Sequence, residues 1–360
     1  MPIEALSARA FRIPTDGPEA DGTLVWDATT AVVVEVSAEG KHGIGYSYTE
    51  AAAAGLVNRV LAPLVVGRDP MAVNEAWVAM LRAVRNFGLE GICAAAISAV
   101  DAALWDLKAK RLDLPLARLL GPVREKVAVY GSGGFTNYSQ ARLEAQLAGW
   151  VGQGIGAVKI KVGTNPAADP QRAEWARAVI GPRVDLYVDA NGALDRPGAL
   201  ALAARFAEQG VVWFEEPVSS DDRQGLRMLR DGAPPGMAIA AGEYGYTPWY
   251  FRDMLADQAV DVLQADATRC LGITGFLQAG ALCQAFGVPM SAHTAPSLHL
   301  HPCCAVPRLR NIEWFFDHVR VEQMLFDGAA QVRDGAIAPD LSRPGLGLEL
   351  KEADAARWAV

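Results

Sequence analysis

Eight short apolar runs, rich in β-branched residues, follow one another along this 360-residue chain, and longer amphipathic segments separate them. The runs are KVAVYGS (126–132), GAVKIK (156–161), VDLYVDAN (184–191), VVWFEE (211–216), MAIAAGE (237–243), AVDVLQAD (259–266), GVPMSAH (287–293) and NIEWF (311–315). Eight strands joined by helical crossovers are what a parallel (β/α)8 barrel requires. The sequence therefore predicts an α/β fold with such a barrel over residues 124–325.

A polar side chain ends or nearly ends each run. These residues are Ser132, Lys161, Asp189, Glu215, Glu243, Asp266, His293 and Glu313. From Lys161 to Glu313, neighbours in this series are 20 to 28 residues apart, about one strand and one helix. Because the carboxyl ends of barrel strands meet at one mouth, where barrel enzymes place their chemistry, we expect these side chains to form a ring.

The first third of the chain has a different pattern. Residues 28–48 predict two strands joined by a hairpin, whereas residues 14–26, rich in Pro, Gly and Asp, predict a mobile loop. Apolar residues then recur at helical spacing in 50–62, 69–86 and 91–110, and the third segment is apolar enough to be buried on most sides. We expect an α+β unit over residues 1–123.

Composition limits the classes of partner. The formal net charge of −8 argues against a nucleic-acid surface, which needs a basic footprint. The five cysteines lack CxxC spacing and suit a reducing compartment. We see neither a leader pattern at the start nor a run of about 18 apolar residues, so we expect a cytoplasmic protein without membrane partners.

Three carboxylates end consecutive predicted strands: Asp189, Glu215 and Glu243. One such carboxylate is typical of a salt-bridged or solvated strand end. Three in one cleft repel each other strongly unless a cation lies between them, and Mg²⁺ prefers oxygen ligands. This spacing predicts a Mg²⁺ site. Strand alternation turns Glu216 away from it, toward the barrel–helix layer or a neighbouring base. A supporting role for Glu216 beside the metal ligands is the alternative.

Basic groups end other strands of the ring. Lys159 and Lys161 are two apart, so they share a face, and their mutual repulsion lowers the pKa of each lysine toward that of a general base. Taken alone, KxK is equally typical of a solvated strand. Asp266 and His293 end neighbouring strands, and a carboxylate bonded to one imidazole nitrogen raises the basicity of the other.

Together these groups suit abstraction of a proton alpha to a carboxylate. The product of that step is a dianionic enediolate, which a divalent metal and nearby hydrogen-bond donors stabilise. Two bases, Lys161 and His293, permit racemisation, or proton removal by one base and acid-assisted loss of a β-hydroxide at the other. A protonated Glu313 could donate a hydrogen bond to the developing charge, or it could be an ordinary strand-end acid.

At these residues the chain resembles the enolase superfamily, in particular its mandelate racemase-like subgroup. The resemblance covers essentially the whole chain. It implies a modified (β/α)8 TIM barrel with an α+β N-terminal capping domain, which the C-terminal segment, residues 326–360, returns to complete. It also implies that loop 14–26 closes over the substrate. Enolase-superfamily sites use a Lys or His base with Mg²⁺.

The resemblance assigns roles to individual residues. KIK implies Lys161 as base and Lys159 as its carboxylate-contacting neighbour, and QAD with SAH implies the Asp266–His293 dyad. VDAN, FEEP and AGE imply Asp189, Glu215 and Glu243 as Mg²⁺ ligands. NIEW implies Glu313 as the electrophilic acid. Ser132 and Asn191, with Lys159, are implied as substrate-binding residues.

The chain also departs from the family pattern. Arg269 and Cys270 follow Asp266 where many relatives have a Lys or an apolar–Gly pair. Asp317 and His318 are reminiscent of acid-sugar dehydratases without being diagnostic. In loop 14–26, four residues could contact a substrate or be ordinary surface: Asp16, Glu19, Asp21 and Trp26.

Three hypotheses follow from the sequence. The first is a Mg²⁺-dependent lyase that dehydrates an acid sugar, a small-molecule carboxylate, to a 2-keto-3-deoxy acid. The second is a racemase or epimerase of a 2-hydroxy acid. The third is a non-catalytic ligand-binding barrel, which would not need these residues in register. Barrels of this kind are commonly symmetric, so we expect a homo-oligomer.

Overall fold

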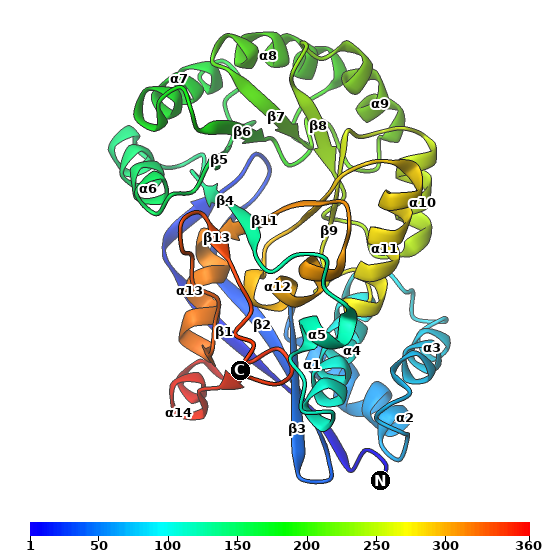
Figure 1. Ribbon diagram of the computed structural model, residues 1–360. Coiled ribbons are helices and arrows are strands. Elements are labelled where there is room, and N and C mark those ends of the chain that lie inside the picture. Colours follow the sequence, from blue (N-terminus) through cyan, green and yellow to red (C-terminus); the bar gives the residue numbers. More distant parts are fainter.

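The computed structural model describes residues 1–360 and contains a closed parallel barrel that lies against a smaller α+β domain (Figure 1). The barrel strands pair in chain order, and the last pairs with the first to close the ring. They are β4 Val127–Gly133, β5 Ala157–Lys161, β6 Asp185–Asp189, β7 Val211–Glu215, β8 Ala238–Ala241, β9 Val262–Ala265, β10 Met290–Ala292 and β11 Leu309–Phe315. The predicted modified (β/α)8 barrel is confirmed.

Helices follow the barrel strands and cover the outside of the ring (Figure 1). They are α6 Gln140–Gly152, α7 Asp169–Ile180, α8 Arg196–Glu208, α9 Arg223–Gly232, α10 Pro248–Ala256, α11 Gly272–Phe286, α12 Pro296–Ala305 and α13 Phe316–Leu325. Inside the barrel, the buried aromatic side chains of Tyr130, Tyr187 and Trp213 fill the lower part. The rings of Tyr187 and Trp213 are stacked, with 4.8 Å between their centroids. A packed interior confines a ligand to the carboxyl-end mouth.

The capping domain is a three-stranded antiparallel sheet with helices on one face. Its elements are β1 Ala5–Ala20, β2 Val25–Ala38, β3 Lys41–Tyr48, α1 Ala52–Leu56, η1 Val57–Leu61, α2 Ala62–Val65, α3 Val73–Ala83, α4 Ile92–Arg111 and α5 Leu116–Leu120. Helix α4 packs so closely on β3 that a Cβ on Gly43 or Gly45 would lie 2.3 or 2.2 Å from a helix carbonyl oxygen. No helix combines the length and apolar character needed to cross a membrane.

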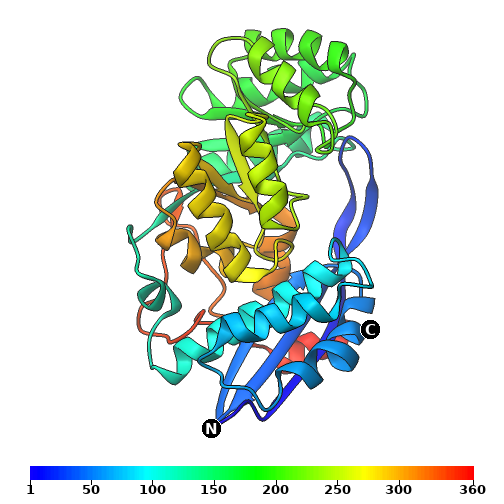
Figure 2. The same cartoon turned by 90° about the vertical axis from the view of Figure 1, so that its right-hand side faces the viewer.

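Residues 14–26 differ from their predicted loop. Strand β1 continues to Ala20 and β2 begins at Val25, so most of the segment is the distal part of a hairpin, with a register shift between Pro14 and Glu19. Figure 2 shows this hairpin extending from the capping domain to the barrel. The loop prediction is wrong because cross-strand hydrogen bonds and docking on the barrel outweigh the local preference of Pro and Gly for turns.

The chain after the barrel runs back to the capping domain. It contains β12 Phe326–Asp327, β13 Ala336–Ile337, β14 Glu349–Leu350, α14 Glu352–Ala355 and η2 Ala356–Trp358. Strand β13 pairs with β4, and near the end Ala359 bridges to Phe11 of β1. Glu352 also forms an ion pair with Arg9 of β1. The C-terminal segment therefore completes the capping domain, as expected.

Candidate active site

Three buried carboxylates lie together at the barrel mouth. Asp189 and Glu215 end neighbouring strands in register, and Glu243 follows the next strand, β8. One oxygen from each can be chosen so that all three lie within 4.8 Å of one another. The predicted ring therefore places these three side chains where one small cation can contact all of them.

The triad has the electrostatics of a cation site. Burial and the charge of Asp189 raise the pKa of Glu215 to about 8, although Lys159 lowers it. Glu243 Oε2 is buried, and His293 Nε2 lies 3.2 Å from it. A hard divalent cation offsets this repulsion and suits three carboxylate ligands, so the donor set fits Mg²⁺.

Strand alternation predicts that Glu216 faces the layer between barrel and helices, but the structure places it elsewhere. Strand β7 ends at Glu215, and Glu216 has a φ of 36°, which ends the alternation of side chains. Its carboxyl group is buried, and one oxygen lacks a partner. Burial and the charges of Glu243 and Asp189 raise its pKa well above the usual value. Glu216 therefore lies beside the triad.

The two lysines of β5 contact the triad directly. Lys159 is fully buried and ion-paired with Glu215, and Lys161 donates to Asp189 Oδ2 at 2.6 Å. Repulsion between the two lysines predicts a lowered pKa for Lys161. Burial and Lys159 do lower it, but the charges of Asp189, Glu243 and Glu215 together raise the pKa of Lys161 above its usual value. That prediction considered only the neighbouring lysine and omitted the carboxylate of the next strand.

Asp266 and His293 form the expected pair. His293 Nδ1 lies 2.8 Å from Asp266 Oδ2, and Nε2 lies 3.2 Å from Glu243 Oε2. Burial lowers the pKa of His293, but Glu243 and Asp266 raise it to about 9. The fully buried His299 fixes the backbone next to this pair, because its Nε2 accepts the N–H of Ala267, the residue after Asp266, at 2.7 Å.

Glu313 is not the protonated, hydrogen-bond-donating acid that was one of its two predicted roles. Its Oε1 lies 2.8 Å from Lys159 Nζ, and its Oε2 accepts the Thr294 N–H at 3.1 Å. Burial raises the pKa of Glu313, but the charges of Lys159 and His293 lower it to about 2. It is therefore ionised here and acts as an acceptor, because Lys159 holds it as an ion pair.

The two other proposed substrate contacts occupy different positions. Asn191 lines the pocket at the mouth, and its buried Oδ1 has no partner. Ser132 is fully buried in register with Lys159 of β5, and its hydroxyl is also unpartnered. Ser132 lies outside the pocket lining, so its role as a substrate ligand stays a prediction.

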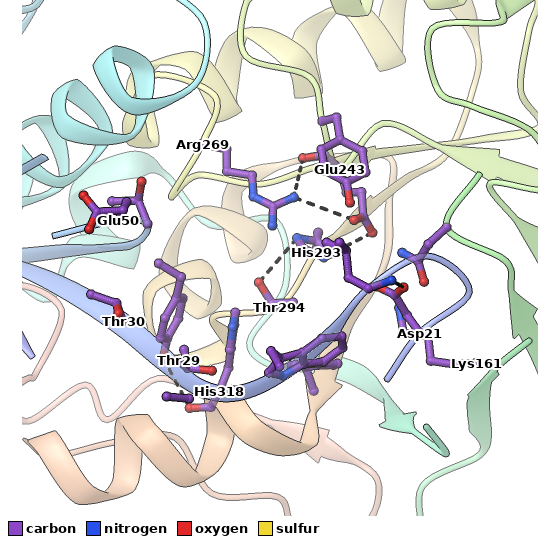
Figure 3. A pocket seen from close by; sticks show the side chains of 18 residues that line it. Asp21, Thr29, Thr30, Glu50, Lys161, Glu243, Arg269, His293, Thr294 and His318 are labelled. Atoms are coloured by element: carbon purple, nitrogen blue, oxygen red, sulfur yellow. Dashed lines mark hydrogen bonds and ion pairs between the residues drawn. The ribbon is translucent and has the colours of Figure 1, made fainter. Parts of the chain in front are cut away.

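A pocket of about 370 Å³ opens over these groups, between the barrel mouth and the capping domain (Figure 3). Lys161, Glu243 and His293 line it. Arg269 also reaches it, with Nη1 donating to the Glu243 carbonyl oxygen at 3.1 Å. This settles the position of Arg269, which its place after Asp266 left open.

The capping domain supplies the other wall, most of which the sequence analysis missed. The hairpin contributes Asp21 and Trp26, while Asp16 instead pairs with Arg142 outside the pocket. Further lining residues are Thr29, Thr30, Tyr48, Glu50 and, from the barrel side, His318. No motif marks the cap residues. The only signal was the run of polar residues at the end of β3, YSYTE.

A buried acidic triad between a lysine pair and a histidine–aspartate pair, at the mouth of a closed barrel, defines the class of metal-dependent barrel enzymes. Residues 142–354 match the family described as enolase C-terminal domain-like. Residues 20–121 match the mandelate racemase/muconate lactonizing enzyme N-terminal domain. The chain belongs to the mandelate racemase/muconate lactonizing enzyme family of the enolase superfamily.

Individual relatives extend this result. An L-talarate/galactarate dehydratase of Salmonella typhimurium is 33% identical over 333 residues, 91% of this chain and 82% of that protein. A mandelate racemase/muconate lactonizing enzyme-like protein from Rubrobacter xylanophilus has a crystal structure that is 49% identical, with a TM-score of 0.98 and 100% coverage of both chains. A racemase from Streptomyces coelicolor, solved with bound magnesium, is 29% identical, with a TM-score of 0.94 over 99% of this chain and 100% of that one. Mg²⁺ is the cofactor of this site.

Proposed function

We propose that the protein removes the proton alpha to a carboxylate through an enediolate and dehydrates an acid sugar to a 2-keto-3-deoxy acid. One observation carries this proposal: Lys161 and His293 line one pocket and flank the carboxylate triad on the ring of strand ends. Lys161 precedes the triad by one strand, and His293 follows it by two. A substrate held at the triad thus presents its alpha carbon between two proton-transfer groups.

Asp189, Glu215 and Glu243 would hold Mg²⁺. Bound Mg²⁺ supplies a Lewis acid for the substrate carboxylate and its enediolate, and it competes with Lys161 for Asp189. Lys159, ion-paired with Glu215 and Glu313, holds a fixed positive charge beside the triad. That charge favours the extra negative charge of the enediolate in a buried site.

Proton transfer falls to the two flanking residues. The neutral amine of Lys161, which would no longer pair with Asp189 once that carboxylate holds Mg²⁺, takes the proton from the alpha carbon. His293 lies between the carboxylates of Asp266 and Glu243, so both of its ring nitrogens face acceptors and the doubly protonated ring is favoured. It gives its Nε2 proton to the departing β-hydroxyl group, which leaves as water. The resulting enol then tautomerises to the 2-keto-3-deoxy acid.

A second candidate function uses the same residues. A racemase or epimerase of a 2-hydroxy acid needs one base on each face of the alpha carbon, and Lys161 with His293 provides such a pair. No leaving group is then required. The similarity to a racemase structure also supports this candidate. The non-catalytic barrel has the least support, because it would not need a buried triad, base and dyad in register.

Proton NMR in D₂O distinguishes the three. The purified protein with Mg²⁺ is incubated with acid sugars, including galactarate, and with 2-hydroxy acids. Loss of the alpha-proton signal with new 3-deoxy methylene signals supports dehydration. Exchange without methylene signals supports the racemase or epimerase. If the wild type turns nothing over while Lys161→Ala and His293→Asn bind ligand normally, the non-catalytic barrel is correct.

A further inference from the structure

His318 lies in the pocket opposite the carboxylate triad. It occupies the first turn of α13, which begins directly after β11 with no loop between them. Strand β11 is four positions from β7 on the eight-strand ring, so it faces Glu215 across the mouth. A side chain fixed there contacts the end of a substrate that points away from the metal. Helix α13 and its preceding strand hold it rigidly.

Two aromatic rings hold the imidazole in one orientation. Tyr48 of the capping domain stacks on it with 3.6 Å between centroids and 19° between planes. Phe315 packs against it edge-on at 5.0 Å. The Tyr48 hydroxyl also donates to the His318 carbonyl oxygen at 3.3 Å. His318 is 8% exposed, and Figure 3 shows it among the residues that line the pocket, near Thr294.

The two ring nitrogens have different surroundings. Nδ1 is buried without a hydrogen-bond partner. Burial and the positive charge of His293 keep the pKa of His318 well below its usual value, so the ring is neutral and one nitrogen carries the proton. A proton on Nδ1 would be a buried donor with no acceptor, which is costlier than an unused lone pair. The proton therefore belongs on Nε2, at the ring edge that faces the pocket.

We propose that His318 is a specificity-determining residue whose Nε2–H donates a hydrogen bond to a hydroxyl or carboxylate oxygen on the distal carbons of the substrate. This inference rests on the proposed function. Nearby Thr29 cannot serve as that donor, because its hydroxyl already donates to Asp317. His318 thus selects acids with an oxygen several carbons from the reacting carboxylate and disfavours short or apolar 2-hydroxy acids.

Two variants separate hydrogen bonding from packing. His318→Phe keeps a ring between Tyr48 and Phe315 but has no donor. His318→Gln keeps a donor and loses the ring. Binding is measured by calorimetry with Mg²⁺ in a Lys161→Ala background, using galactarate, L-rhamnonate and D-arabinonate as long probes. Glycerate, which lacks the distal carbons, is the short probe. Melting temperatures report packing, and alpha-proton exchange in D₂O is followed in variants that keep Lys161.

We expect His318→Phe to weaken the tightest long probe about 10- to 100-fold, with glycerate affinity and melting temperature unchanged. His318→Gln should bind the long probe within a few-fold of the parent protein but melt at a lower temperature. Equal long-probe affinity in His318→Phe and the parent would overturn the proposal, as would equal weakening of both probes. If the wild type neither binds nor exchanges any probe, the proposed function itself fails. That result is separable, because it is seen before any substitution at position 318.

Discussion

The two walls of the pocket are built differently. The barrel wall carries charged side chains on consecutive strand ends, where the register of a parallel ring fixes each one. The opposite wall joins distant pieces of chain: the hairpin between β1 and β2, the end of β3, and α13. The difference suggests that proton transfer and metal binding depend on the rigid ring, while substrate choice depends on how the capping domain docks.

Metal removal should produce the largest effect, and it acts on the barrel wall alone. We expect chelation by EDTA to reduce turnover by more than about 10³-fold and added Mg²⁺ to restore it. Glu215→Gln keeps the side-chain shape but removes a ligand charge. It should lose both the activity and the rise in melting temperature that Mg²⁺ gives the wild type. A Mg²⁺-dependent rise that survives in Glu215→Gln would contradict the assigned triad.

Substitutions of the two proton-transfer residues should affect proton exchange and dehydration differently. Lys161→Ala removes the base, so both alpha-proton exchange and product should fall about 10²- to 10⁴-fold. His293→Asn removes the acid and should abolish dehydration while exchange at the alpha carbon continues. NMR in D₂O follows both signals in one sample. Exchange that survives in Lys161→Ala but not in His293→Asn would reverse the two roles.

The same contrast explains what the sequence could predict. Asp189, Glu215 and Glu243 could be placed because each ends an apolar run, and eight runs of similar spacing imply one ring. The charge state of Glu313 could not be predicted, because it depends on a 2.8 Å contact with Lys159 from a strand about 150 residues earlier in the chain. The spacing of the runs shows which residues lie at the mouth of the barrel, but not which of them form ion pairs with one another.

The capping wall was mostly beyond sequence reasoning. Residues 14–26 looked like a loop because Pro and Gly disfavour strands locally, yet the segment gains its order from contacts with the barrel. The Ala20 carbonyl oxygen, for example, accepts the Thr136 N–H at 2.8 Å. Glu216 failed for a related reason, since alternation holds only while the backbone remains extended. Long-range docking and a single positive φ leave no periodic signal in the sequence.

A substitution at Gly22 tests whether substrate binding depends on docking of the hairpin, and its expected effect on kcat/KM is smaller. A Cβ at this hairpin position would lie 2.3 Å from the Ala190 carbonyl oxygen and 2.8 Å from that of Val162, so any side chain pushes the hairpin off the barrel. We expect Gly22→Ala to lower kcat/KM about 10-fold, chiefly through KM, with little change in melting temperature. Gly149→Ala is the control, because nothing lies within 4 Å of that Cβ on α6. Equal kcat/KM in the two variants would show that substrate binding does not depend on docking of the hairpin.

The smallest effect is expected at Glu19, a hairpin residue with no exposed surface. One carboxyl oxygen accepts the Trp26 indole N–H at 2.9 Å, and the other has no partner. Burial and the charge of Asp317 raise the pKa of Glu19 to about 8, with Asp16 adding to the effect and Arg320 opposing it. In an undocked hairpin the carboxyl returns to its ordinary pKa of about 4.5.

The docked hairpin therefore binds a proton that the undocked one releases. Between about pH 4.5 and pH 8, docking weakens as the pH rises, and above pH 8 the full cost of burying the ionised group remains. We expect hydrogen exchange of the β1–β2 hairpin amides, corrected for their intrinsic rates, to accelerate through this window in the wild type. Glu19→Gln is neutral at every pH and should remove that dependence, and any accompanying rise in KM. A pH dependence that persists unchanged in Glu19→Gln would assign it to another group, and docking of the capping wall would then not depend on this carboxyl.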